Sequence, residues 1–334
     1  MRLGDNRGLR SRPDASPVPH NAASKTDAAY LTALMLAVLG AVFFSGKAVV
    51  AKLLYRHGID AVTLIALRML LSMPVFVAVA LWTRRASPRL GAGDYARIGA
   101  LGLLGYYGSS MLDFLGLQYI SAGLERLILF LTPSFVLLLG LLAYRRPVLA
   151  RQWASLLCAY AGIVLVFWHD LGVGGSDVAF GGALVLGAAL AYAVYLLLSG
   201  ELLQRVGTLR LVALAMTSSS IACLLQYALL RPLPSLLEQT AAVWGLSLLN
   251  ATLCTVLPVF VTMIAVARIG AGTTAQAGMI GPVSTLFLGW WLLGEPITRL
   301  QLAGTALVLV GIYLLTTRKV PAAVVTGAEV GKAV

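Results

Sequence analysis

Residues 118–134 read QYISAGLERLILFLTPS, and residues 267–283 read ARIGAGTTAQAGMIGPV. The second stretch begins 149 positions after the first, and the two align without a gap through an isoleucine, an alanine, a glycine and a proline. The same offset aligns further pairs on both sides: Arg56 with Arg205, Gly58 with Gly207, Pro147 with Pro296, Gln152 with Gln301, and Gly162 with Gly311. The chain is therefore predicted to be a tandem duplication of one unit.

Hydrophobic residues make up 59% of the 334 positions and charged residues only 11%. A soluble domain carries about 25% charged residues, so this chain cannot cover itself with a surface suited to water. Uncharged apolar runs of roughly 20 residues recur along it, and a helix of that length crosses about 30 Å of hydrocarbon. Transmembrane β-strands would be about half as long and would alternate in polarity. We therefore expect an all-α polytopic membrane protein.

Ten transmembrane helices are predicted, joined by short loops: 29–50, 61–82, 96–116, 122–143, 150–168, 179–199, 209–230, 240–266, 273–293 and 299–317. Residues 29–171 and 178–317 would form two repeats of five helices each. Residues 1–28 are polar and rich in Pro, Ser and Arg, which predicts a disordered tail, and residues 318–334 are predicted to form a second tail. The first apolar stretch is long enough to span, so we expect an uncleaved anchor and not a signal peptide.

The net charge of +12 is better explained by topology than by nucleic-acid binding. Eighteen of the 25 Lys and Arg residues fall in alternate segments, namely the two tails and the loops near 84–97, 145–151, 205–210 and 268. The intervening loops hold four: Lys52, Arg56, Arg231 and Arg299. Cytoplasmic loops carry such an excess, so both termini are predicted to be cytoplasmic, in a bacterial-type inner membrane. We expect membrane lipid as a partner and no nucleic acid.

Each predicted repeat holds five spans, and five is an odd number. The second copy then starts on the opposite face of the membrane from the first, with residues 172–177 as the external joint. The two halves are therefore predicted to be inverted repeats, an arrangement typical of secondary transporters that work by alternating access. Duplication also occurs in channels and in some membrane enzymes, so this pattern does not exclude them.

Two turns carry a resemblance to a known family. Residues 117–122 read LQYISA and lead into a span that contains a proline, and residues 294–296 read GEP before the last helix. With ten predicted helices in two repeats, the chain resembles the EamA family of the drug/metabolite transporter superfamily over about residues 29–317. The resemblance implies movement of a small metabolite, often outward across the inner membrane. The first copy reads YRRP at 144–147, where the family usually has an acidic turn, so we expect Glu295 to cap the last helix.

Five charged side chains lie inside predicted spans of the first copy: Lys47, Arg68, Asp113, Glu125 and Arg126. Their counterparts 149 positions later are uncharged: Leu196, Thr217, Thr262, Thr274 and Ala275. Under the predicted topology all five belong to the outer half of the membrane. Charges at such depth are costly and usually face partners, a cavity or a substrate path.

Three hypotheses for this cluster remain open. In the first, Lys47 and Arg126 extend to the outer interface while the other charges form static ion pairs. In the second, the pairing of Asp113 with Lys47 or Arg126 closes an external gate. In the third, Asp113 or Glu125 exchanges a proton, and Arg68 holds an anionic group of the substrate.

Several uncharged residues are weaker candidates for a functional role. Tyr107 and Gln276 are predicted to line a central cavity, with Gln226, Asn250, Thr255 and Thr262 as weaker candidates, although buried amides and hydroxyls more often join helices. Pro133 and Pro282 are repeat mates inside predicted spans. A proline removes a backbone hydrogen bond and kinks the helix, so we expect this pair of kinks to line the cavity.

No catalytic signature is present, so we expect no enzyme, no cofactor and no metal site. Cys158, Cys223 and Cys254 show no metal-binding spacing. The predicted function is a secondary transporter that exports a small organic metabolite, as a monomer or homodimer, with a proton as coupled ion under the third hypothesis. The alternative is a membrane-embedded enzyme or lipid-handling protein without transport activity.

Overall fold

The computed structural model describes residues 20–84, 89–145 and 149–316, and every regular element within them is helical. In chain order these are α1 (His20–Arg56), α2 (Ala61–Arg84), α3 (Ala92–Gly102), η1 (Leu103–Gly108), α4 (Ser109–Leu117), α5 (Ala122–Leu129), α6 (Thr132–Tyr144), α7 (Ala150–Val206), α8 (Thr208–Leu230), α9 (Leu233–Leu237), α10 (Ala241–Ala251), η2 (Thr252–Val256), α11 (Leu257–Ala277), α12 (Ile280–Leu288), η3 (Gly289–Leu293) and α13 (Arg299–Thr316). The elements η1 to η3 are π-helical. The all-α prediction is confirmed for the described part of the chain.

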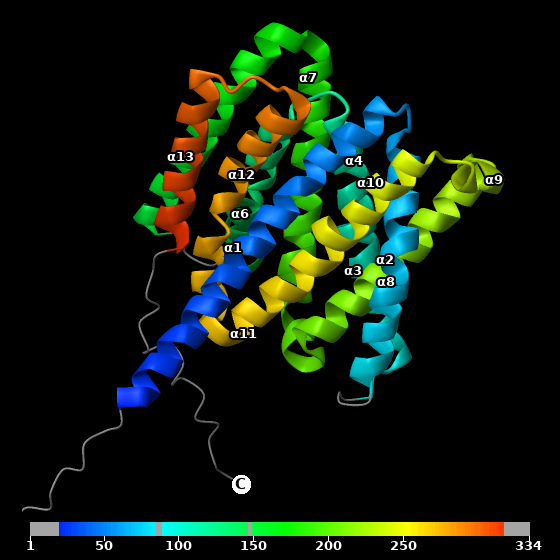
Figure 1. Ribbon diagram of the computed structural model, residues 1–334. Coiled ribbons are helices and arrows are strands. Elements are labelled where there is room, and N and C mark those ends of the chain that lie inside the picture. Colours follow the sequence, from blue (N-terminus) through cyan, green and yellow to red (C-terminus); the bar gives the residue numbers. More distant parts are fainter. Residues whose placement is uncertain (1–19, 85–88, 146–148, 317–334) are drawn as a thin grey trace, which may run out of the picture.

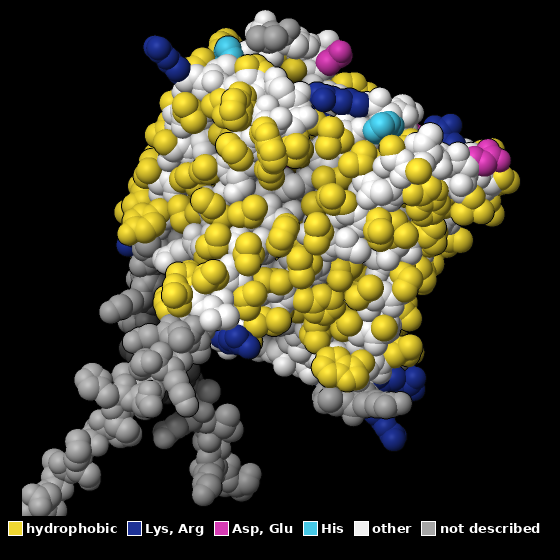
Figure 2. Space-filling model, viewed as in Figure 1, with side chains coloured by type: hydrophobic (Ala, Val, Ile, Leu, Met, Phe, Trp, Pro, Cys, Tyr) yellow, Lys and Arg dark blue, Asp and Glu magenta, His cyan; other side chains and the backbone are white. Residues whose placement is uncertain are grey.

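Among the described residues, seven helices are long and apolar enough to cross a membrane: Tyr30–Arg56, Ala61–Arg84, Ala122–Ala143, Ala150–Gly172, Gly174–Val206, Thr208–Leu230 and Ala241–Gly270. The face seen in Figure 2 carries hydrophobic side chains across its middle, while the charged side chains gather at two opposite ends. Such a band fits the hydrocarbon layer, because lipid tails cannot solvate charges. The chain is an integral membrane protein.

The other three predicted spans fall on weaker elements. The stretch from α3 to α4 is divided by η1, and α12 continues only as the short η3. The last apolar helix, Arg299–Leu314, is shorter than the others. At the other end of the chain, α1 begins at His20 and so extends into the predicted tail 1–28. Residues 1–19 of that tail and the predicted tail 318–334 lie outside the described residues.

The 149-residue offset reappears in the backbone conformation. Gly58 and Gly207, which are repeat mates, follow α1 and α7 with positive φ angles of 80° and 84°. Arg145 and Gly294, also mates, both take the left-handed conformation after the helices that precede them. A left-handed arginine is unusual, because its Cβ crowds the backbone there. The duplicated chain therefore turns in the same way at matching points.

Helices of the two copies pack mainly against each other. In Figure 1, α1 lies beside α11, α13 lies beside the first part of α7, and α2 lies near α8; all three pairs are in contact. The largest buried cluster draws residues from α1, α2, α4, α8 and η2. The two halves therefore share one interior and are not separate domains.

The contact between α7 and α13 shows at atomic detail how helices of the two copies pack against each other. A Cβ atom at Gly162 would lie 2.5 Å from the Gly304 carbonyl oxygen, and one at Gly311 would lie 2.8 Å from that of Ser155. Gly162 and Gly311 are repeat mates, as are Ser155 and Gly304, so the two contacts are the same contact made twice. Small residues permit such close backbone approach in membranes.

Both predicted proline kinks coincide with interruptions of a helix. The break between α5 and α6 precedes Pro133, and the break between α11 and α12 precedes Pro282. Pro133 is exposed and Pro282 is buried, and neither is among the residues that line the described cavities. That the pair lines a substrate cavity stays a prediction.

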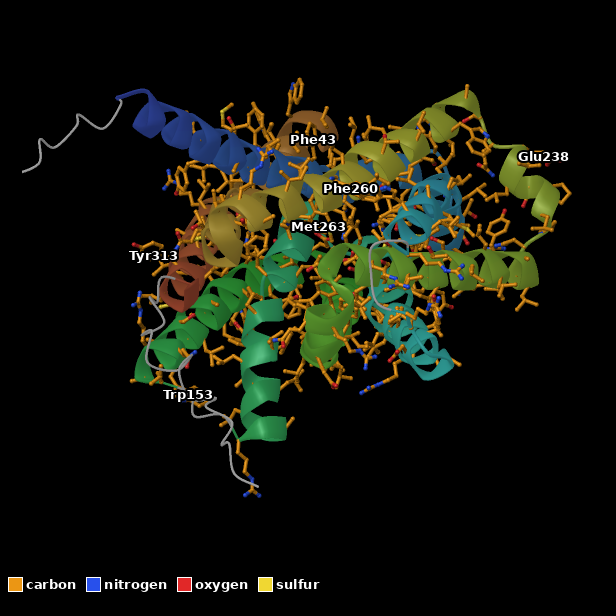
Figure 3. All side chains as sticks on the ribbon, turned by 90° about the horizontal axis from the view of Figure 1, so that it is seen from below. Phe43, Trp153, Glu238, Phe260, Met263 and Tyr313 are labelled. Carbon is orange, nitrogen blue, oxygen red and sulfur yellow. The ribbon has the colours of Figure 1, made fainter. Side chains whose placement is uncertain are left out.

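The tryptophans near span ends are exposed, with Trp82 at 70% and Trp153 at 47%. In Figure 3, Trp153 and Glu238 lie at opposite edges of the molecule, with Phe260 and Met263 of α11 between them. Exposed tryptophans near helix ends are typical of membrane–water interfaces.

Candidate functional site

The five charged residues singled out in the first copy come together inside the helix bundle. Lys47 lies on α1, Arg68 on α2, Asp113 on α4, and Glu125 and Arg126 on α5. Each is at most 6% exposed. Glu125 and Arg126 lie in the middle of α5, a short helix that follows Ser121 and ends at Leu129. Four segments of the first copy thus converge on one buried polar cluster.

Lys47 is the centre of this cluster. Its ammonium group forms an ion pair and a hydrogen bond with Asp113, and it lies 3.2 Å from Glu125 Oε1. The Glu125 oxygens have no hydrogen-bond partner among the described residues. Two carboxylates on different helices therefore depend on one cation. Their burial is costly, and this attraction offsets it only while the geometry holds.

Arg126 is held by different groups. Its Nη2 donates a hydrogen bond to Ser45 Oγ at 3.3 Å, and the Ser45 hydroxyl hydrogen is shared between the Ala41 carbonyl oxygen at 2.7 Å and the Gly281 carbonyl oxygen at 3.0 Å. The guanidinium carbon lies 4.8 Å from the centre of the Phe44 ring and 5.3 Å from that of Phe130. Aromatic faces attract cations at this range. Arg126 thereby links α5 to α1 and, through Ser45, to α12 of the second copy.

Arg68 on α2 contacts a different element of the second copy, η2. Its Nε donates a hydrogen bond to Thr255 Oγ1 at 2.8 Å, and its guanidinium carbon lies 5.2 Å from the centre of the Phe114 ring. The same ring lies 5.2 Å from Lys47 Nζ. Arg68 Nη1 is buried and has no hydrogen-bond partner among the described residues. Both N–H groups of Nη1 therefore remain without an acceptor among the described residues.

The cluster holds three cationic groups and two carboxylates. Within the described residues the ion pairs of this cluster involve Lys47 alone, while Arg68 and Arg126 contact hydroxyl groups and aromatic rings. Lys47 and Arg126 are both buried in this structure, and that they extend to the outer interface stays a prediction. Static pairing, gating and substrate or proton work remain as predictions.

Several residues of the site were missed or underrated in the sequence. Phe44 and Ser45 were not candidates, although Phe44 precedes Lys47 by three positions and so shares its helix face. Thr255 was only a weak candidate, yet it holds Arg68. A search for aromatic residues at helical spacing from each charge would have found Phe44 but not Ser45, which lies only two positions from Lys47. Nothing in the spacing indicates Thr255, because it belongs to the other copy.

Tyr107 and Gln276 do not join the cluster through any hydrogen bond, ion pair or ring contact of the described residues. Tyr107 instead lines a cavity of about 390 Å³ together with Gln226 on α8. Gln276 is half-buried near the end of α11. A role for either in substrate binding stays a prediction.

Glu295 corrects an expectation. Its carboxylate accepts a hydrogen bond from the Ala122 backbone N–H at 3.1 Å and lies 3.4 Å from Lys52 Nζ. It therefore caps α5, not the last helix as predicted. The last helix is capped by Thr298 and Gln301, whose side chains each accept a hydrogen bond from the other's backbone. The turn after η3 folds back onto the first copy, which sequence order does not reveal.

The described residues hold no group of three or more His, Cys, Asp or Glu side chains that would suit a metal ion. The three cysteines are free thiols, and Cys223 and Cys254 are buried. Cys254 packs beside the charged cluster, since a Cβ at Gly46 would lie 3.2 Å from its sulfur. This thiol is a natural reporter of access to the site.

Known proteins share this chain's pattern over nearly its whole length. The profile of the EamA-like transporter family matches residues 31–168 and again 179–317. The uncharacterized transporter YcbK of Bacillus subtilis (strain 168) is 30% identical over 291 residues, which cover 84% of this chain and 90% of YcbK. An uncharacterized transporter of Archaeoglobus fulgidus is 25% identical, over 78% of this chain and 90% of its own length.

A solved crystal structure of a protein also matches, with a TM-score of 0.59 and 16% identity. The match covers 88% of this chain and 96% of that one, and at this identity it bears on the fold alone.

Proposed function

The chain belongs to the EamA-like transporter family, and from this premise we propose that it is a secondary transporter that exports a small organic metabolite across the inner membrane by alternating access. Both termini are cytoplasmic in this proposal, as the distribution of Lys and Arg favours. The match to this family and the names of the similar proteins support a transporter in general. What we add as a proposal is the class of substrate, the outward direction of transport and the alternating-access mechanism.

Ten crossings in two inverted repeats belong to this proposal. Gly175 interrupts α7 with non-helical backbone angles, which supports two crossings within that one element. Gly270 interrupts α11 in the same manner. The segments from α3 to α4, from Gly270 to η3, and α13 would supply the three crossings beyond the seven long helices. The repeated contact between α7 and α13 supports a two-fold relation between the copies, which alternating access exploits.

One observation carries the mechanism: a buried lysine binds two carboxylates on two other helices. We assign this ion-paired group, Lys47 with Asp113 and Glu125, to the closed external gate. Opening would separate α1 from α4 and α5 and give the three charges to water, which lowers the cost of breaking the pairs. Protonation of Asp113 or Glu125 would weaken its hold on Lys47, so the same group suits coupling to a proton.

The gate is tested with Cys254 as the reporter. Cys158 and Cys223 are replaced by alanine, and a membrane-impermeant thiol reagent is added to the outside of sealed vesicles. Asp113→Asn removes one arm of the gate and should raise the labelling rate of Cys254 about tenfold. Asp60→Asn is the matched control, because Asp60 pairs with Arg231 at 2.7 Å outside the cluster, and it should leave the rate unchanged.

Equal labelling of both variants and the parent would show that the charges are static ion pairs. Transport itself is tested by a thermal-shift screen against amino acids, nucleotide-sugars and hydrophobic amines, followed by counterflow of any ligand in liposomes. A ligand at 100 times its dissociation constant should stabilise the protein by about 2.7 kcal/mol. A ligand that binds but gives no counterflow would contradict the transporter proposal.

A further inference from the structure

A basic cavity opens at one end of the molecule, near the connection between α2 and α3. It has a volume of about 870 Å³ and is lined by Leu81, Arg84, Arg89, Leu90, Tyr95 and Arg210. Three of these residues are arginines and none is acidic. Arg84 and Arg89 are exposed, while Arg210 is buried in the first turn of α8. Arg84 and Arg89 therefore give the cavity two exposed positive charges.

The nearest acidic residue in the sequence is already engaged. Asp94 accepts a hydrogen bond from the Gly91 backbone N–H at 3.1 Å and forms an ion pair with Arg205. The hydrogen bond from Gly91 and the charge of Arg205 lower the pKa of Asp94, so it stays ionised and bound to Arg205. Asp94 therefore pairs with Arg205 and not with Arg84 or Arg89.

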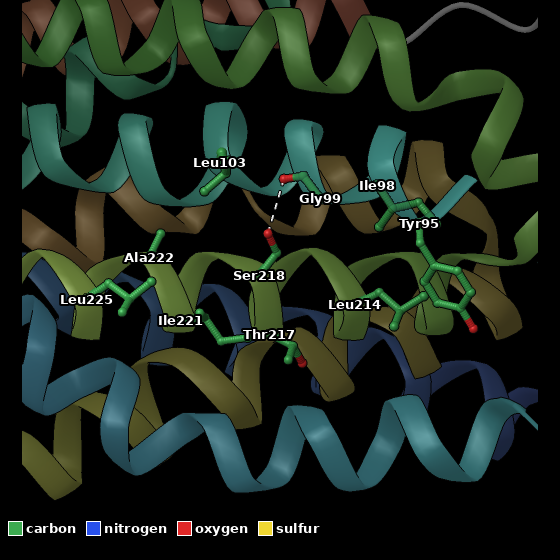
Figure 4. A pocket seen from close by; sticks show the side chains of 10 residues that line it. All are labelled: Tyr95, Ile98, Gly99, Leu103, Leu214, Thr217, Ser218, Ile221, Ala222 and Leu225. Carbon is green, nitrogen blue, oxygen red and sulfur yellow. Dashed lines mark hydrogen bonds between the residues drawn. The ribbon is translucent and has the colours of Figure 1, made fainter. Parts of the chain in front are cut away.

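The cavity continues into an apolar groove between α3 and α8. Tyr95 lines both, and the groove runs on past Ile98, Leu103, Leu214, Ile221 and Leu225 with a volume of about 430 Å³. Figure 4 shows side chains of the two helices facing each other along it. Ser218 Oγ donates a hydrogen bond to the Gly99 carbonyl oxygen at 3.2 Å and closes its floor. Leu103, Ile221 and Leu225 are 44%, 46% and 59% exposed, so the groove is open along its side.

The dimensions of the groove match one leaflet of a bilayer. From Leu214 to Leu225, α8 rises about 17 Å, which is about half of a hydrocarbon core of roughly 30 Å. Tyr95, which lines both the cavity and the groove, lies at the charged end of the groove, and aromatic residues favour the membrane interface. A basic head site, an interfacial aromatic and an apolar groove thus follow each other in the order of the parts of a phospholipid.

We propose that this continuous site binds one anionic phospholipid, with its phosphate at Arg84 and Arg89 and one acyl chain in the groove between α3 and α8. Charge complementarity selects the headgroup, since arginines at a membrane surface attract anionic lipids. The open side of the groove admits the chain from the surrounding bilayer. The site is separate from the charged cluster around Lys47, and its occupancy does not depend on what the protein transports.

Phosphatidylglycerol is the probe, and binding to the purified full-length protein is measured by native mass spectrometry and by thermal shift, with phosphatidylcholine as the neutral comparison. Wild type should bind phosphatidylglycerol in preference. Arg84→Gln with Arg89→Gln should weaken that binding by about fivefold for each arginine removed. Arg231→Gln with Arg299→Gln, two arginines outside this cavity, is the matched control and should bind as wild type does.

A separate experiment tests whether an acyl chain of the lipid occupies the groove between α3 and α8. Ala222→Phe fills the groove from α8, and Ala306→Phe places the same ring on an exposed position of α13. Only the first should weaken phosphatidylglycerol binding. Equal binding of the two lipids, or no loss in the double arginine variant, would overturn the proposal. So would glycerophosphate protecting the protein as well as the lipid does, because the site would then be one for a soluble anion.

Discussion

At the scale of single residues, Lys47 determines whether the buried carboxylates are tolerable. Asp113 and Glu125 lie on different helices, and each has an oxygen without a hydrogen-bond partner among the described residues. A buried carboxylate without a counter-charge is expensive, whereas a buried pair roughly balances its own desolvation. Substitution of Lys47 therefore removes the ion-pair partner of both carboxylates at once.

Lys47→Met should destabilise the protein by about 3–5 kcal/mol, because it leaves two buried carboxylates unpaired. Adding Asp113→Asn and Glu125→Gln removes those charges and should recover most of the loss. The measurement is thermal unfolding in detergent for the single and triple variants.

Lys52→Met on the same helix is the control. Lys52 makes only a partly exposed pair with Glu295, so its loss should cost at most about 1 kcal/mol. A triple variant less stable than Lys47→Met alone would show that the pairing is not what holds these charges.

At the scale of helices, glycines set the distances between the two copies. Gly162 brings α7 against α13 so closely that a methyl group would overlap the Gly304 carbonyl oxygen. Gly200 of the same helix has no such role, since nothing lies within 4 Å of a Cβ built there. Composition alone does not distinguish these two glycines; their neighbours do.

Gly162→Val should destabilise by at least about 1–3 kcal/mol, because an overpacked contact forces backbones apart. Gly200→Ala should be neutral or stabilising by up to about 1 kcal/mol, since alanine is the better helix former. Thermal unfolding of both variants checks this. Equal effects would mean that helix propensity, and not the contact with α13, governs position 162.

At the scale of the whole molecule, the helices of the two copies pack together around one shared interior. The contacts of α1 with α11, α2 with α8, and α7 with α13 all join the first copy to the second. Arg68 and Arg126 also reach groups of the second copy, Thr255 directly and the Gly281 carbonyl through Ser45. Neither half contains its own complete core.

A chain divided at Gly174 should therefore fold only when both pieces are present. Residues 1–174 and 175–334 expressed separately should aggregate, and co-expression should yield a complex that elutes with the intact protein in size-exclusion chromatography. A single half that stays monodisperse and unfolds cooperatively would contradict the shared interior.

The sequence by itself determined the membrane class, the duplication and the identity of the five buried charges. These follow from composition and spacing, because a helix that crosses hydrocarbon must be long and apolar, and a charge within it stands out at once. Only the tertiary structure decided which charges meet, that Arg68 is held by Thr255, that Glu295 caps α5, and where η1 and η3 divide the helices. Such contacts join residues far apart in the chain, and the free energy that selects them comes from packing between helices that no local pattern encodes.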